Sequence, residues 1–418
     1  MDLPNSSAHA RHLLLLGANH RTCPLASRES ILPHVSYRRM AAARTQGLLS
    51  DLVLLMTCNR IEAYALTARS RDARDVLLHL LRPESPRHVY GLEGVDAASH
   101  LFRVAAGLDS VAHGEDQIAR QVRAAPDARP ASWRRMDGLR DLFLRAAREA
   151  GRIRGLADPE GGQVSASHAA ARYVQGLFRT QRPIVALIGS GKMARLAAEA
   201  IRPRARLWVA NRDPRKAREI AARVDGKPVP FRDLARIFRE ADAVLAATSA
   251  GGPLVRRETV VRAMAARGER PLWLVDLGFP RNIDPACGTI AGVTLLNIDD
   301  LAPWAWHPPD PSALARAERA IREEAVLAVE TLRPRPADLV ASLRRAASEW
   351  RRREVEQALS RMPGASDEQR RVVEKLADRL MNRILHAPTS MLRRMQAEGQ
   401  TALVAELLGE WRDLEGTG

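Results

Sequence analysis

The sequence predicts a multidomain α/β protein: an α+β N-terminal domain, a doubly wound central domain and an all-α C-terminal domain. A chain of 418 residues is long enough for two to four domains. Between about 183 and 305, short apolar runs alternate with helical stretches, the pattern of a parallel, doubly wound sheet. Beyond the Pro-rich segment 304–311, nearly all of the pattern has helical spacing.

The N-terminal zone, from about 11 to 115, mixes short strands with amphipathic segments. Leu13–Leu16 and Leu52–Leu55 are brief apolar runs bounded by turn or polar residues, so we predict two buried strands. The segment His100–Leu108 has the composition of a helix that ends in a small-residue turn. A helical, Arg-rich zone follows from about 133 to 179.

The central and C-terminal zones complete the predicted organisation. Four central strands are expected: Ile184–Ile188, Leu207–Ala210, Ala243–Ala247 and Leu272–Asp276. In the tail, Ser366 and Gln369 have the spacing of a helix capping box. Apolar residues then recur at helical spacing and predict one face that packs on another helix, for example of a second subunit: Val373, Leu376, Leu380 and Ile384. We expect domains at 1–158, 159–305 and 306–418.

Charge and cysteine content narrow the class of protein. The net charge of +16 favours a polyanionic partner such as nucleic acid, although a GC-rich genome that writes Arg for Lys would explain part of the Arg excess. The three cysteines have no CxxC spacing, which argues against a metal site and a disulfide framework and fits a reducing cytosol. No apolar run approaches the roughly 18 residues that span a bilayer, so we expect a soluble, cytoplasmic protein without membrane contact.

A glycine-rich turn marks the central domain. Strand Ile184–Ile188 runs into Gly189, Ser190, Gly191, Lys192, Met193 and Ala194, and a helix follows. This GxGxxA pattern between strand and helix is typical of dinucleotide sites, where the glycines admit a tight turn and the pyrophosphate and the small third residue lets helix pack on strand. A glycine turn without a ligand remains the alternative. We expect these six residues to bind the cofactor.

The end of the next strand indicates which dinucleotide binds. An NAD site has an acidic residue there, but this strand ends in Asn211 and Arg212, with Lys216 just beyond. A cation at this place suits a 2′-phosphate, so we predict NADP(H), although the neighbouring Asp213 weighs the other way. Thr248 follows another strand and is expected on the nicotinamide side.

Cys58 is the chemically ambiguous residue of the N-terminal zone. It lies in the stretch MTCNRIE and admits three interpretations: a buried inert thiol, a metal ligand or a nucleophile. A thiolate that attacks an ester forms a thioester, and a hydride donor then reduces the thioester to an aldehyde. Arg60 is a candidate to lower the pKa of this thiol or to bind a substrate carboxylate, and Glu62 to bind an ammonium.

A polar segment, 107–118, follows the predicted helix that includes His100. Its acidic and amide side chains suit the binding of an amino acid, with ordinary caps and turns as the alternative. A lone histidine is more often structural than catalytic, so the residues alone leave the role of His100 open.

Taken together, the motifs resemble the glutamyl-tRNA reductase family. The resemblance runs over nearly the whole chain, in the segments GANHRTCPLASRE, TCNRIEAY, HLFRVAAGLDSVAHGEDQI, VSASHAAARY, GSGKMA, ANRDP, VDLGFPRNIDP and NRILHAPT. It implies a V-shaped homodimer with a catalytic domain, a long connecting helix, a Rossmann-type NADP-binding domain and a helical dimerisation domain. It also implies NADPH-dependent reduction of glutamyl-tRNA(Glu) to glutamate-1-semialdehyde, the first step of tetrapyrrole synthesis.

Carried over by position, the resemblance places the family's nucleophile on Cys58 and an important histidine on His100. It implies a glutamyl pocket of Thr57, Asn59, Arg60, Ser110, Glu115, Asp116, Gln117 and Gln121. Glutamate-1-semialdehyde aminotransferase is a candidate docking partner, and a tRNA substrate agrees with the charge of +16.

The chain departs from the family pattern at several positions. His113 and Asp116 stand where an apolar residue and a proline are common, Ala194 replaces a glycine and Lys192 a glutamate. Pro126 and Pro130 fall where the family continues a helix, and proline inside a helix costs about 3 kcal/mol, so we expect a break there. The departures at His113 and Asp116 keep one alternative open, a degenerate paralogue that binds tRNA or a partner enzyme. The nucleotide domain taken alone keeps a second one open, a shikimate- or quinate-type dehydrogenase.

Overall fold

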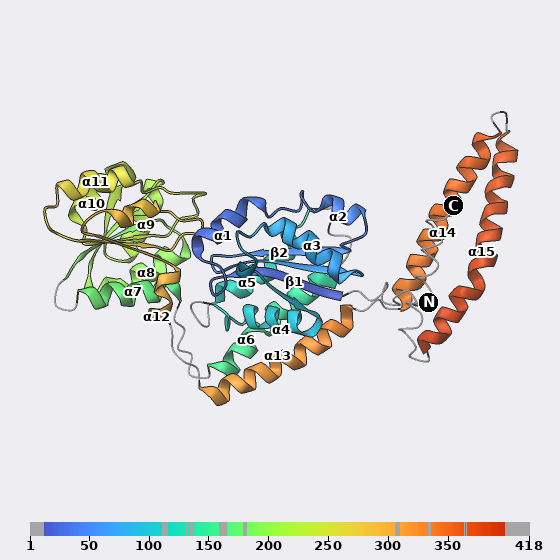
Figure 1. Ribbon diagram of the computed structural model, residues 1–418, viewed down its shortest axis with the longest axis horizontal. Helices are drawn as coiled ribbons and strands as arrows, with labels where there is room; N and C mark the ends of the chain where they lie inside the picture. Colours follow the sequence, from blue (N-terminus) through green and yellow to red (C-terminus); the bar gives the residue numbers. More distant parts are fainter. Residues whose placement is uncertain are drawn as a thin grey trace. The chain divides into compact units, whose positions relative to one another are not determined.

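The computed structural model describes residues 12–110, 116–130, 133, 138–158, 165–178, 182–305, 310–332, 336–362, 364 and 366–397 (Figure 1). Within these ranges, none of the helices has both the length and the apolar character that crossing a membrane requires. The predicted three-part architecture is confirmed: an α+β domain, a parallel-sheet domain and a helical C-terminal part.

The N-terminal domain is built on a four-stranded sheet with the order β2-β3-β1-β4. Its strands are β1 (His12–Asn19), β2 (Asp51–Met56), β3 (Arg60–Thr67) and β4 (Tyr90–Glu93). The two predicted strands are confirmed as the cores of β1 and β2, while β3 and β4 were not predicted. All eight residues of β3 are buried, yet Arg60 and Glu62 among them interrupt the apolar pattern by which a strand is recognised.

Helices cover this sheet, and one of them ends where prolines predict it. They are α1 (Leu25–Ile31), α2 (Ala41–Thr45), α3 (Ser70–Leu81), α4 (Gly94–Ala105), α5 (Asp116–Ala124) and α6 (Gly138–Ala157). The predicted helix at His100 begins six residues earlier, at Gly94. The predicted break is confirmed, since α5 ends at Ala124 and the short 3-10 turn Ala125–Ala128 contains Pro126.

The central domain is a six-stranded parallel sheet with the order β10-β9-β8-β5-β6-β7. From the first strand in sequence this is the doubly wound order 3-2-1-4-5-6, whose direction reverses between β5 and β8. The strands are β5 (Ile184–Ile188), β6 (Arg206–Asn211), β7 (Lys227–Pro230), β8 (Ala243–Ala246), β9 (Leu272–Asp276) and β10 (Val293–Asn297). All four predicted strands are present; the two missed ones, β7 and β10, are the edge strands, which need less continuous apolar sequence.

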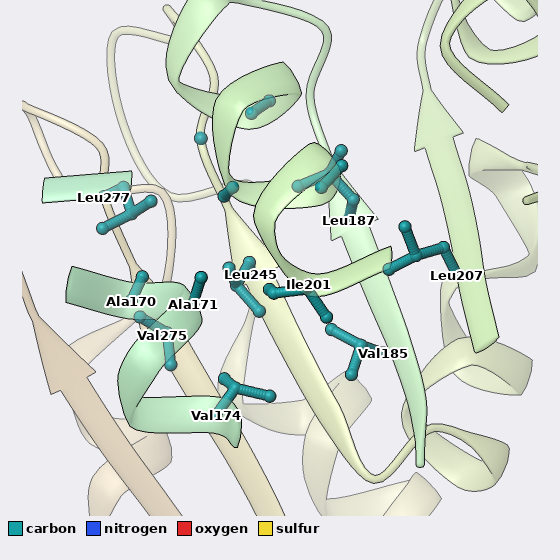
Figure 2. Close-up of a cluster of buried hydrophobic side chains, with 14 of the residues drawn as sticks. Ala170, Ala171, Val174, Val185, Leu187, Ile201, Leu207, Leu245, Val275 and Leu277 are labelled. Carbon is teal, nitrogen blue, oxygen red and sulfur yellow. The ribbon is translucent and has the colours of Figure 1, made fainter. Parts of the chain in front are cut away.

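Both faces of this sheet are buried, because successive side chains of a strand point to opposite sides. Val185 and Leu187 of β5 join one core with α7 (Ala166–Leu177), α8 (Lys192–Ile201) and α9 (Pro214–Arg223), as Figure 2 shows for its labelled members. Ala186 and Ile188 join the opposite core with α10 (Leu234–Glu240) and α11 (Arg257–Ala265).

After the short α12 (Ala302–Ala305), helix α13 (Pro311–Leu332) returns to the N-terminal domain. Ion pairs attach it to α4 and α6: Glu318 accepts from Arg103 at 2.5 Å, and Glu324 pairs with Arg145 at 2.8 Å and with Arg152 at 3.1 Å. The chain therefore connects back to the first domain after leaving the second.

The C-terminal part is a pair of contacting helices, α14 (Pro336–Ser360) and α15 (Asp367–Ala397). The capping box is confirmed, because Ser366 N donates to Gln369 Oε1 at 2.8 Å and Gln369 N to Ser366 Oγ at 3.3 Å. Along α15, Leu376, Leu380 and Ile384 each expose more than half of their surface. An apolar stripe left open in this way is typical of a helix that packs on another chain.

Candidate functional site

One cavity of about 900 Å³ brings the N-terminal and central domains together. From the N-terminal domain it is lined by the link between β2 and β3 and by one face of α5. From the central domain it is lined by the turns that follow β5, β6, β8 and β9. In a doubly wound sheet, ligands bind at this carboxyl edge, where the strand order reverses.

Cys58 lies in the middle of the three-residue link 57–59 between β2 and β3. Thr57 N donates to Arg60 O at 2.9 Å, and Asn59 N donates to Thr57 Oγ1 at 3.2 Å, so the link is held on both sides. His20 N donates to Asn59 O at 2.9 Å and ties the end of β1 to the same link. These contacts place a partly exposed thiol on the cavity wall.

Cys58 packs against a small apolar cluster. Leu25, Ala166 and Ile298 are its buried members, and Met193 and Phe279 pack against the same cluster. Met193 belongs to the glycine-rich turn and Phe279 to the loop after β9, so the thiol lies against the nucleotide-binding edge of the central domain. This arrangement separates Cys58 from the other two cysteines, Cys23 and Cys287, which are buried.

Most of the predicted substrate-binding residues also line the cavity. They are Thr57, Asn59, Ser110, Gln117 and Gln121. Asn59 is nearly buried, and its Oδ1 lacks a hydrogen-bond partner within the described part of the chain. A buried amide oxygen without a partner is costly to the fold. Glu115 and His113 lie outside the described residues, and Asp116 is described only as the first residue of α5.

Arg60 and His100 are placed differently from the expectation of direct contact. Neither lines the cavity; both are buried behind the Cys58 link. The Arg60 guanidinium binds Glu62 at 3.0 Å and Asp109 at 2.9 Å and also contacts the Asp109 carbonyl oxygen, while its Nε lacks a partner among the described residues. His100 Nε2 lies 2.8 Å from Glu62 Oε1.

Glu62 is the centre of this buried cluster, which the sequence did not reveal. Besides Arg60 and His100, it accepts hydrogen bonds from Tyr64 at 2.7 Å and from Tyr90 at 2.5 Å. The Glu62 side chain is fully buried and does not line the cavity, so the structure places it away from the position expected for binding a substrate ammonium. The pattern Arg-x-Glu-x-Tyr along one strand, with side chains on one face, is the signal that would have indicated the cluster.

The charges of the cluster stabilise one another. Burial alone would lower the pKa of Arg60, but the carboxylates of Glu62 and Asp109 raise it above its ordinary value. Burial opposes a charge on Glu62, yet His100 and Arg60 hold its pKa below the ordinary value. Burial and the neighbouring Arg60 lower the pKa of His20 from 6.5 to about 4. Arg60 and Glu62 therefore stay ionised, and His20 beside them stays neutral, at pH 7.

The glycine-rich turn has the shape of a phosphate cradle. Gly189 has a φ of +128°, and a Cβ there would lie 2.2 Å from the Ala247 carbonyl oxygen. A Cβ on Gly191 would meet no atom within 4 Å and would project into open space. Ser190, Lys192 and Met193 line the cavity with both glycines. Ala194 does not; it is buried in the core between helix and sheet, which fits the packing role of the third position.

The far end of the cavity carries the predicted cations. Asn211, Arg212 and Lys216 line it, and Thr248 and Ser249 line it nearer the glycine turn. Asp213, which weakened the NADP prediction, caps α9 instead, since its Oδ1 accepts from Arg215 N at 2.9 Å.

Comparison with known proteins agrees with these features. Residues 16–155 match the model for the glutamyl-tRNAGlu reductase N-terminal domain, and 316–411 match the dimerisation domain of the same enzyme. Residues 170–303 match the shikimate / quinate 5-dehydrogenase model. That match is confined to the nucleotide-binding part and leaves the Cys58 domain to the first model, so a shikimate-type enzyme does not account for the chain.

Full-length relatives give the same result. Glutamyl-tRNA reductase 2 of Anaeromyxobacter dehalogenans is 34% identical over 415 residues, covering 96% of this chain and 92% of the relative. The Stenotrophomonas maltophilia glutamyl-tRNA reductase is 34% identical over 402 residues, covering 94% of this chain and 93% of the relative. The solved Methanopyrus kandleri reductase is 27% identical over 92% of this chain and 98% of that one, with a TM-score of 0.41. By these matches over most of its length, the chain belongs to the glutamyl-tRNA reductase family.

Proposed function

We propose that this protein reduces the glutamyl group of glutamyl-tRNA(Glu) to glutamate-1-semialdehyde with NADPH, through a thioester on Cys58. The observation that carries the proposal is the shared cavity, in which a partly exposed thiol and a dinucleotide-type glycine turn line the same space. A nucleophile and a hydride site must act on one carbonyl carbon, and the cluster of Cys58, Met193 and Phe279 holds the two regions in contact.

The first half of the proposed reaction needs the N-terminal domain alone. The Cys58 thiolate attacks the ester carbonyl carbon, a C–S bond forms, the C–O bond to the terminal ribose breaks, and the ribose oxygen leaves with a proton. The side chains of Thr57, Asn59, Ser110, Gln117 and Gln121 offer the polar wall that would bind the glutamyl group. Arg60, Glu115 and Asp116 stay predicted contacts.

The second half returns the thiol. When bound, NADPH would supply a hydride for the thioester carbonyl carbon, so that the C–S bond would break and Cys58 would be regenerated as the aldehyde is released. The chain contributes the apolar cluster around Cys58, which limits water at the sulfur. We propose that His100, held by Glu62, orients the Arg60 cluster behind the reacting link rather than touching the substrate.

The residues around the cavity fit NADPH. The open space above Gly191 and the N-terminus of α8 suit a pyrophosphate. Arg212 and Lys216 suit a 2′-phosphate. The acid that lines the same end, Glu219, is already paired with Arg223 at 3.1 Å.

The test is the replacement of Cys58 by Ser, with Cys287→Ser as the matched control because Cys287 is buried in the central domain. Glutamyl-tRNA without NADPH should trap an acyl group on the parent protein and on the control, located by mass spectrometry on Cys58, and none on Cys58→Ser. Semialdehyde formation should be lost in the same variant. Full activity of Cys58→Ser would refute the thioester mechanism, and tRNA binding without acylation of the parent would favour a degenerate paralogue.

We also propose a homodimer through α14 and α15, whose exposed apolar stripe and match to the dimerisation domain support it. Docking of glutamate-1-semialdehyde aminotransferase stays a prediction.

A further inference from the structure

Two consecutive residues of α1, Arg28 and Glu29, contact the central domain beside Cys58. Arg28 is fully buried and binds Asp299, and Glu29 binds Arg281. Asp299 begins the 3-10 turn after β10, and Arg281 lies in the loop after β9 that also carries Phe279. Neither contact is part of the predicted substrate pocket or cofactor site.

Arg28 joins the reacting link to the central domain through one side chain. Its Nη1 donates to the Cys58 carbonyl oxygen at 2.5 Å, and its Nη2 donates to the two Asp299 oxygens at 2.5 and 2.7 Å. Its Nε donates to the Cys23 carbonyl oxygen at 3.2 Å, which fixes the guanidinium from the side of α1. Because Nε, Nη1 and Nη2 of one planar guanidinium each donate to a different group, the side chain has little rotational freedom, and the Cys58 backbone and Asp299 are held at a set separation.

Glu29 makes the second connection. Its Oε1 accepts from Arg281 N at 2.6 Å and its Oε2 accepts from Arg281 Nε at 2.7 Å. Both side chains are mostly buried, with 18% and 21% of their surfaces exposed, so water weakens this ion pair less than a surface pair. Phe279, two residues before Arg281 in the chain, packs against the same apolar cluster as Cys58. The ion pair therefore helps to fix the position of Phe279 in this cluster.

We propose that Arg28 and Glu29 are positioning residues that fasten the central domain to the Cys58 link, so that the thioester is reduced rather than hydrolysed. The inference rests on the proposed thioester mechanism. The thioester has two fates. With a hydride and a proton it gives semialdehyde and the free thiol, with NADPH oxidised to NADP⁺. With water, whose oxygen adds to the carbonyl carbon as the C–S bond breaks, it gives glutamate and the free thiol. Acylation uses groups of the N-terminal domain, namely the thiol and the polar wall. Reduction also needs the nucleotide site of the central domain to be held close to the thioester.

The experiment measures these two fates separately in the full-length protein. The variants Asp299→Ala, Glu29→Gln and Arg281→Met should form the acyl-enzyme from glutamyl-tRNA, without NADPH, within twofold of the parent rate. With saturating NADPH, the ratio of semialdehyde to free glutamate should fall at least fivefold. Glu240→Gln is the matched control, because it removes two ion pairs, with Arg236 at 3.1 Å and Arg239 at 3.3 Å, that lie wholly within α10, and it should leave the ratio unchanged.

A charge exchange distinguishes positioning from general damage. Glu29→Arg and Arg281→Glu should each lower the ratio, and the double variant should recover at least half of the loss, since the opposite charges again meet. An unchanged ratio in the single variants, or an equal loss of acylation and reduction, would overturn the inference. Absence of an acyl-enzyme on the parent protein would instead refute the thioester mechanism itself.

Discussion

The two glycines of the nucleotide turn give a sharp test, because the structure assigns them different reasons to lack a side chain. A Cβ on Gly189 would lie 2.2 Å from the Ala247 carbonyl oxygen and 2.8 Å from its carbon, and the φ of +128° suits glycine alone. A Cβ on Gly191 would meet nothing within 4 Å, and its φ of −70° suits any residue.

The expected magnitudes follow from these contacts. In Gly189→Ala the unfavourable backbone angle costs about 1–3 kcal/mol, and the clash with a backbone atom must be relieved by movement of β8, so we expect a total near 3 kcal/mol. For a domain of this size that lowers the midpoint of thermal unfolding by roughly 10 °C. In Gly191→Ala, a helix N-cap becomes poorer while the unfolded chain loses entropy, and the two effects leave stability within about 1 kcal/mol.

NADPH binding should respond differently from stability, because Gly191→Ala should weaken it while leaving the fold nearly unchanged. The new methyl group of Gly191→Ala occupies the space where the pyrophosphate would approach the backbone, so the NADPH dissociation constant should rise tenfold or more, about 1.4 kcal/mol. Calorimetric unfolding without ligand and fluorescence titration with NADPH measure the two quantities on each variant. Tight NADPH binding by Gly191→Ala, or parental stability of Gly189→Ala, would refute the reasoning.

Three further predictions concern charges. Replacing Arg212 and Lys216 together by Ala should weaken NADPH binding about tenfold or more and leave NADH binding unchanged, because only NADPH carries the 2′-phosphate; equal losses in titrations with both would contradict it. Glu62→Gln should lower the free energy of unfolding by about 3 kcal/mol in urea titrations, since it removes a carboxylate that neutralises the buried Arg60. The control Glu240→Gln, which loses ion pairs that are more exposed, should lower it by less than about 0.5 kcal/mol. Similar losses in the two variants would argue against a stabilising role of the cluster. The pKa of His20, lowered to about 4, makes the unfolded chain bind a proton more readily between pH 6.5 and 4, so stability should fall by up to about 3 kcal/mol as the pH drops through that window. His20→Gln should lose that part of the pH dependence, and an unchanged profile would show that His20 does not titrate in this way.

Local pattern was enough wherever neighbouring residues carry the information. The four central strands, the glycine turn, the capping box of α15 and the break at Pro126 follow from rules that act over a few residues. Strand β3 was missed because its buried polar residues are stabilised by partners from other elements: Asp109 after α4, Tyr90 of β4 and His100 of α4. A charged residue in a sequence predicts an exposed position unless the buried partners that neutralise it are known.

The sequence by itself indicated the kind of chemistry to expect of this protein: a candidate nucleophilic cysteine, a dinucleotide-type turn, an excess of positive charge and the family motifs in order. The tertiary structure decided which residues share a space. It brought Cys58, Met193 and Phe279 to one apolar cluster. It placed Arg60 and His100 outside the cavity lining and joined Arg28 to Asp299, 271 positions away. The reason is physical: spacing along a strand or helix sets the direction of a side chain, whereas a buried ion pair forms where the packing of distant elements excludes water.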